Sequence, residues 1–170
     1  RPDVVVHCTS SSIARVMPEL RTILASKAAI VSTTEELAYP PHAHAAQARQ
    51  VHQWARRAGV AVLGTGVNPG FVMDALPIAL TGVCSEVRRV TVHRVQDARI
   101  RRLPFQQKIG AGLTPAAFRR GVRDGRVRHV GMAESIAMIA DSVGWRLDRI
   151  TDQVCPKIAT AAVASAFSRS

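Results

Sequence analysis

The chain has 170 residues, of which 47% are hydrophobic and 4% aromatic, and it carries a formal net charge of +11. This length allows one domain with a real core or parts of two domains. The charge raises nucleic acid as a partner, but no aromatic residues are interleaved with the arginines for base stacking. We therefore expect no nucleic-acid partner, and favour a solvated basic face or an anionic small ligand.

Three widely spaced cysteines, Cys8, Cys84 and Cys155, form no C-x-x-C motif. A sparse and odd set of cysteines argues for a reducing compartment and against a disulfide scaffold or a structural zinc site. No signal peptide is visible, and the longest apolar window, residues 71–83, is too short to cross a bilayer. We expect a cytoplasmic protein with no membrane partner.

The first half of the chain alternates short apolar runs with amphipathic segments. The patterns predict strands and helices in turn, with strands over residues 4–8, 29–31 and 60–63 and helices over residues 12–26, 45–58 and 73–83. Pro18 in the first helix predicts a later start or a kink, and Gly59 is placed to end the second. Strands that alternate with helices of this length imply a parallel sheet with right-handed crossovers.

Small polar or glycine-rich loops follow each of the three predicted strands, at Thr9–Ser11, Thr33–Glu35 and Gly64–Gly70. In an open α/β sheet, ligands bind outside the carboxyl ends of the strands. Glycines let a backbone approach a ligand closely, and the side chain of Asn68 offers both a donor and an acceptor. We expect the three loops to line one crevice that binds a small molecule.

The second half of the chain changes character, with a predicted domain junction near residues 84–87. Apolar and charged residues alternate over residues 87–95, which predicts a half-exposed strand in a different, mixed or antiparallel sheet. Thr114 has the position of a helix N-cap, with Pro115 as the first helical residue. The other expected segments are a basic loop at 99–104, a glycine-rich stretch at 108–114, helices at 115–124 and 133–143 (the latter ended by Gly144), a strand at 145–150 and a weakly patterned tail at 160–170.

Three segments carry a family resemblance. They are D-V-V-V-H-C-T-S-S, S-T-T-E-E-L-A-Y-P and G-T-G-V-N-P-G-F-V-M-D-A-L-P, in this order. Together they resemble the dihydrodipicolinate reductase-like family, and most closely its 2,4-diaminopentanoate dehydrogenase-type branch, over roughly residues 2–150. The third segment is the specific one. The resemblance implies an α/β fold with a partial Rossmann-type parallel sheet. Residues 1–85 would be the C-terminal part of the NAD(P)-binding domain, and residues 86–170 part of a mixed α+β substrate-binding and oligomerisation domain.

The resemblance also implies an activity. It is hydride transfer between a nicotinamide cofactor, NADP or NAD, and a nitrogen-bearing carbon of a small amino-acid-like substrate, in a homo-oligomeric oxidoreductase. Cofactor contacts would come from Cys8, Thr9, Ser10, Ser11, Thr33, Thr34, Glu35 and Asn68. Substrate contacts would come from Gly70, Gly110, Gly112 and Thr114, and the catalytic residues would be Lys108 and Asn68.

Two departures limit what the family pattern implies. The phosphate-binding G-x-G-x-x-G turn is absent, so the chain resembles a fragment that we expect to be inactive alone. Arginine-rich residues 99–107 replace a His-His-x-His-Lys run of the dihydrodipicolinate reductases proper. An oxidative deamination and a reduction of the dihydrodipicolinate type both stay open. So do a non-catalytic or regulatory ligand-binding protein on a Rossmann scaffold, and an inactive truncated fragment.

The residues alone leave structural alternatives beside these roles. Thr9–Ser11 would serve as a helix cap, Asn68–Gly70 as a simple turn, and Lys108 as a solvated lysine. His42 and His44, with His52 beyond, invite a metal site. Because no cysteine or carboxylate completes that set at a recognised spacing, we expect no bound metal.

Overall fold

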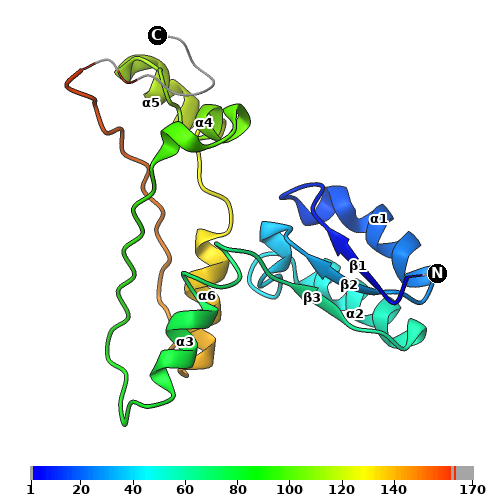
Figure 1. Ribbon diagram of the computed structural model, residues 1–170. Helices are drawn as coiled ribbons and strands as arrows, with labels where there is room; N and C mark the ends of the chain where they lie inside the picture. The colour runs from blue at the N-terminus through cyan, green and yellow to red at the C-terminus, as the bar shows by residue number, and fades with distance from the viewer. Residues whose placement is uncertain (1, 162, 164–170) are drawn as a thin grey trace. The chain divides into compact units, whose positions relative to one another are not determined.

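The computed structural model describes residues 2–161 and residue 163 (Figure 1). The described residues form two compact units, the first within Arg1–Val92 and Val130–Thr151, the second within His93–His129 and Asp152–Ser170. The first unit contains the sheet, and the described residues of the second form short helices and extended chain. No helix in the described part of the chain is both long and apolar enough to span a membrane.

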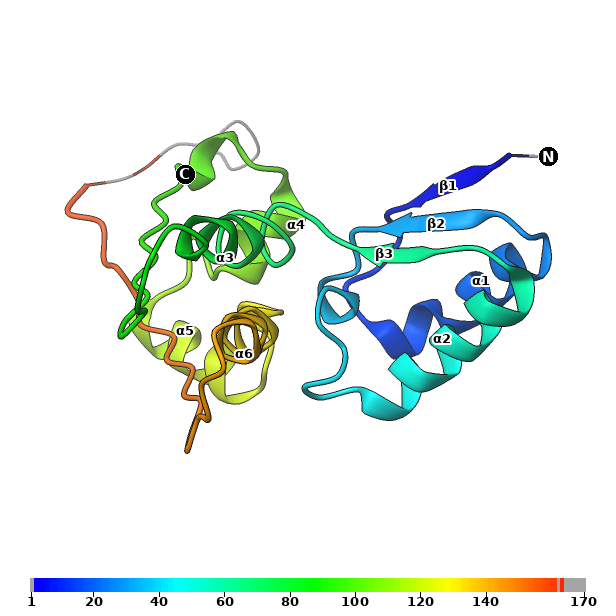
Figure 2. The same ribbon diagram turned by 90° about the horizontal axis from the view of Figure 1, so that it is seen from below.

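A three-stranded parallel sheet organises the first unit, in the order β1-β2-β3. Its strands are β1 (Val4–His7), β2 (Ala29–Ser32) and β3 (Val62–Gly64). The crossovers are α1 (Ile13–Ala25) and α2 (Ala45–Ala58), with the short 3-10 helix η1 (Glu35–Leu37) after β2. Both α-helices lie on the same face of the sheet (Figure 2). The predicted parallel α/β arrangement is confirmed, and the bounds predicted for the second helix are those observed.

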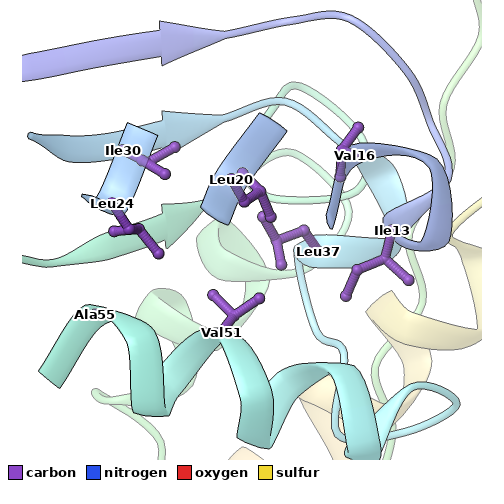
Figure 3. Packing of buried hydrophobic residues seen from close by; sticks show 8 residues of the cluster. All are labelled: Ile13, Val16, Leu20, Leu24, Ile30, Leu37, Val51 and Ala55. Carbon is purple, nitrogen blue, oxygen red and sulfur yellow. The ribbon is translucent and has the colours of Figure 1, made fainter. Parts of the chain in front are cut away.

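Aliphatic side chains between the sheet and these helices form the core of the first unit (Figure 3). In α1, buried apolar residues recur every three or four positions and form one face of the helix. Pro18 lies on the opposite, exposed side. The predicted later start is therefore wrong, because α1 begins at Ile13 and contains Pro18 within its span. The cluster comprises Ile13, Val16, Leu20, Leu24, Ile30, Leu37, Val51 and Ala55.

Two further helices complete the first unit, α3 (Ala75–Thr81) and α6 (Met132–Ser142), and they pack against each other. Helix α3 is shorter than predicted because Asp74 is its N-cap, with a side chain that accepts from the amide of Ala75. Helix α6 lies one residue before its predicted span, and Gly144 follows it with a φ of 74°. Since α6 groups with the sheet, these units differ from the predicted domains at 1–85 and 86–170. That division of the protein stays a prediction.

The second unit contains η2 (Ala98–Ile100), α4 (Leu103–Lys108) and α5 (Pro115–Arg123). The basic loop predicted at 99–104 is partly wrong, because Pro104 stands in the first turn of α4, where a missing backbone N–H costs nothing. Thr114 caps α5 as predicted and accepts a hydrogen bond from the amide of Ala117 at 3.3 Å. Among the described residues of this unit, Phe118 and Val127 have buried apolar side chains.

Two predicted strands are wrong. Residues 87–95 and 145–150 are extended or irregular and form no β-bridge in the described chain. A strand needs a neighbour to bond its backbone, and no described segment pairs with either one. Val95 is 99% exposed, whereas Val87, Val90 and Val92 are half-buried without any strand pairing. Most of the predicted tail at 160–170 lies outside the described residues.

Candidate functional site

The parallel register brings the three predicted loops to one edge of the sheet. His7 is paired with Ser32, and Ser32 with Gly64, so all three strands end at the same level. The backbone continues this ladder into the loops, where the amide of Thr33 donates to His7 O at 3.0 Å and that of Thr65 to Ser32 O at 2.8 Å. As predicted, the loops start together at the carboxyl edge, where open α/β sheets bind ligands.

The first loop, residues 8–12, exposes polar side chains. Cys8 and Thr9 are exposed, and Ser10 and Ser11 are half-buried. The Ser10 hydroxyl accepts from the amide of Ser12 at 3.3 Å, which is a local turn contact. The helix-cap alternative gains no support, because the amide of Ile13 at the start of α1 donates to the Glu36 carboxylate at 2.8 Å.

A buried histidine joins the first loop to the second. His7 is 4% exposed, and its Nδ1 lies 3.0 Å from Ser32 Oγ while its Nε2 lies 2.6 Å from Glu19 Oε2. Thr9 Oγ1 donates to the same Glu19 oxygen at 2.8 Å. Hydrogen bonding to His7, and next to Thr9, lowers the pKa of Glu19. This network fixes the ends of β1 and β2 relative to α1.

Ser32, His7 and Glu19 form a hydrogen-bonded row of a hydroxyl, an imidazole and a carboxylate, which are the three groups of a serine hydrolase triad. Ser32 is 0% exposed and donates to Thr34 Oγ1 at 3.0 Å. No substrate can reach this hydroxyl, so the arrangement is structural and not nucleophilic.

The second loop, Thr33–Glu35, presents its residues unequally. Thr33 is exposed and Glu35 half-buried, whereas Thr34 is fully buried and its hydroxyl is used by Ser32. A cofactor contact through the Thr34 hydroxyl therefore has no geometric support, although its backbone still forms part of the loop. Contacts at Thr33 and Glu35 stay predictions.

The third loop, Gly64–Gly70, is shaped by close backbone approaches. A Cβ on Gly70 would lie 2.4 Å from the amide nitrogen of Gly66, and the φ of Gly70 is 119°. Only glycine fits that combination. Val67 and Phe71 are 62% and 52% exposed, while the Oδ1 atom of Asn68 between them is buried. The loop thus exposes two apolar side chains on either side of an inward-turned amide oxygen.

Asp74 and Ser135 hold this loop through hydrogen bonds, and neither had a predicted role. The Asp74 carboxylate is completely buried. Its Oδ2 accepts from the amide of Gly70 at 2.9 Å and from the Ser135 hydroxyl at 2.7 Å, and its Oδ1 accepts from the amide of Ala75 at 2.6 Å. An aspartate at the second position of the predicted helix was an available signal that the helix starts one residue after it, with Asp74 as the cap. Nothing in the sequence links it to a serine 61 residues away.

The four remaining predicted site residues lie in the second unit. Lys108 is half-buried at the end of α4. Gly110 has a φ of 74°, and a Cβ there would lie 2.7 Å from Phe118 Cδ2, whereas Gly112 has open space around it. Gly110 and Thr114 therefore shape and cap their own unit. A site shared by these residues and Asn68 stays a prediction. In the described part of the chain, no three His, Cys, Asp or Glu residues are grouped to hold a metal.

Fold and loops together define an α/β chain that carries part of an open parallel sheet, with polar and glycine-rich loops at the carboxyl ends of its strands. Residues 71–167, more than half of the chain, match the family model of the 2,4-diaminopentanoate dehydrogenase C-terminal domain. The chain belongs to this family, which confirms the resemblance drawn from its three sequence segments.

Two relatives support the assignment. A 2,4-diaminopentanoate dehydrogenase of Acetoanaerobium sticklandii is 38% identical over 159 residues, covering 93% of this chain and 45% of that protein. The solved structure of an amine dehydrogenase from Mycobacterium smegmatis has a TM-score of 0.72 and 22% identity, covering 97% of this chain and 48% of the other. The similarity to the amine dehydrogenase structure shows that the two chains share a fold. The chain spans about half the length of both relatives.

Proposed function

We propose that the protein containing this chain is a nicotinamide-dependent oxidoreductase that acts on a small amino compound, with NADP or NAD as its cofactor. The observation that carries the proposal is the common register of His7, Ser32 and Gly64, which sets three polar loops at one sheet edge. That edge is where dinucleotides bind in doubly wound sheets. The dehydrogenase names of the two relatives support an amine-bearing substrate.

The loop chemistry fits the nicotinamide end of such a cofactor. A nicotinamide is a flat ring with a carboxamide, so it requires apolar contact on its faces and polar partners at its rim. Val67 and Phe71 offer exposed apolar surface on either side of the half-buried Asn68, and Thr33 offers an exposed polar group in the second loop. When bound, the nicotinamide supplies the acceptor for a hydride from the amine-bearing carbon.

The residues of this chain would bind and orient the cofactor and the substrate. In the proposal, Asn68 holds the ring or the substrate amine through its side-chain amide, and the glycines of the third loop let the backbone come close. The first loop, with Thr9 and Ser10, lies along the cofactor. Lys108 of the second unit takes up the proton that the amine releases on oxidation, which it would donate in the reverse direction, or binds a substrate carboxylate. Hydrolysis of the oxidised substrate would then give a ketone and ammonia. We also propose that the protein works as a homo-oligomer.

The test uses the native protein that contains these residues. Calorimetric titration with NADPH and NADH should show binding of at least one, and absorbance at 340 nm should report reduction of NADP or NAD on addition of 2,4-diaminopentanoate or related small amines. Asn68→Ala should lower kcat/KM by roughly ten- to a hundredfold. Gln50→Ala, on the exposed face of α2, is the matched control and should leave it unchanged.

Each alternative predicts a different result. Failure to bind either nucleotide would refute the proposal. Nucleotide binding without turnover of any amine would instead favour a regulatory ligand-binding protein on the same scaffold.

A further inference from the structure

The buried carboxylate of Asp74 does more than cap a helix. A serine or threonine hydroxyl would satisfy the first amide of α3 without burying a charge. Burial of a carboxylate is unfavourable unless several donors compensate it. Asp74 gathers three such donors, from Gly70, Ala75 and Ser135, at 2.6 to 2.9 Å. The Gly70 amide and the Ser135 hydroxyl bond to Oδ2, and the Ala75 amide bonds to Oδ1. Two acceptor oxygens on one side chain therefore connect the loop, the start of α3 and helix α6.

The loop is clamped from the α6 side by a second contact. Gly131, which precedes α6, has a φ of 91°, and a Cβ on it would lie 2.3 Å from Pro69 Cγ. Pro69 is itself buried. Asn68 is therefore followed by a proline packed on the start of α6 and by Gly70, whose amide is bonded to Asp74. Both contacts restrict the residues immediately after Asn68.

We propose that Asp74 and Ser135 are positioning residues that fix the Gly64–Gly70 loop and thereby the place where Asn68 presents its side-chain amide. The inference rests on the proposed function, because it assigns Asn68 to the cofactor or substrate. Ser135 orients the carboxylate, the carboxylate holds the Gly70 amide, and neither residue touches the reacting groups. A small displacement of an orienting residue reduces turnover strongly.

The test compares Ser135→Ala with Ser135→Thr in the native protein. Ser135→Ala should lower kcat about tenfold or more with little change in the KM for the nucleotide, and Ser135→Thr, which keeps the hydroxyl, should recover most of the loss. Ser142→Ala is the matched control, since its hydroxyl bonds to Met138 O on the exposed part of the same helix. It should leave kcat unchanged. Thermal unfolding of each variant separates lost stability from lost positioning.

Hydrogen exchange gives a readout that does not depend on activity. The Gly70 amide should exchange faster in Ser135→Ala than in Ser135→Thr or Ser142→Ala, in the absence of any ligand. If Gly70 stays equally protected in all variants, the positioning role is refuted whatever the activity. If Gly70 is deprotected in Ser135→Ala but the wild-type protein oxidises no amine, the clamp stands and the proposed function fails. Equal losses of kcat in Ser135→Ala and Ser135→Thr would also overturn the inference.

Discussion

Gly64→Ala tests how β3 is packed against the segment after β2. A Cβ at residue 64 would lie 2.0 Å from the carbonyl oxygen of Leu37 and 2.5 Å from its carbonyl carbon. An ordinary carbon–oxygen contact is about 3.3 Å or longer, so the backbone of η1 must move by roughly 1.3 Å. Gly64 has no positive φ, so the substitution strains no left-handed backbone and the destabilisation comes from this clash. Overpacking of this kind costs about 2–3 kcal/mol.

The matched control for this substitution is Gly82→Ala, because its φ is also ordinary and its Cβ would lie 3.3 Å from the nearest atom, Ala79 O. It should change the free energy of unfolding by less than about 0.5 kcal/mol. Urea unfolding of the 170-residue chain can be followed by the fluorescence of Trp54, which packs on the core, in a Trp145→Phe background. If Gly64→Ala is as stable as the control, the close approach of β3 to Leu37 is refuted.

Three further tests, which use four substitutions, address other parts of the structure. Leu20→Ala, at a fully buried core position, should cost about 2–5 kcal/mol, whereas Leu80→Ala, at a side chain 63% exposed, should cost less than about 0.5 kcal/mol in the same urea assay; equal effects would contradict the core. Thr114→Ala removes the cap of α5 and should destabilise that helix by about 1 kcal/mol, seen as faster hydrogen exchange in its first turn; unchanged exchange would contradict the cap. Hydrogen bonding to His7 lowers the pKa of Glu19 below 4.5, so the carboxylate stabilises the fold at neutral pH and this contribution is lost as the pH falls through the lowered pKa. Glu19→Gln should therefore show a shallower loss of thermal stability in acid, and identical pH profiles would argue against the His7 network.

Elements whose signals are local could be predicted from the sequence. The apolar stripe of α1, the left-handed glycine after α2 and the Thr114-Pro115 start of α5 each lie within one helix and its caps. A helix bonds its own backbone, so its pattern and caps suffice to place it. The three polar loops were found for a similar reason, because each follows directly on a short β-branched run.

Strands outside the parallel sheet and the support of the third loop could not be predicted in this way. The alternation over residues 87–95 gives a strand only where a second segment hydrogen-bonds to its backbone. The sequence of residues 87–95 alone does not show whether such a segment exists. Asp74 and Ser135 belong to helices that meet only in the folded unit. Thr34 shows a related limit, because its place in a polar loop suggests a cofactor contact while its hydroxyl is buried against Ser32, so a contact through its backbone stays a prediction.

The register of the sheet links the stability of the first unit to its proposed site. Residues one step before the strand ends, Val6, Val31 and Leu63, form one row across the sheet. Because side chains alternate along a strand, a shift by one residue would exchange these with the inward row that contains Ile30. The same shift would move one polar loop out of level with the others. Burial of the Ile30 row against α1 and α2 therefore selects the register that aligns the three loops, so the aliphatic core determines where a ligand at this edge would meet polar groups.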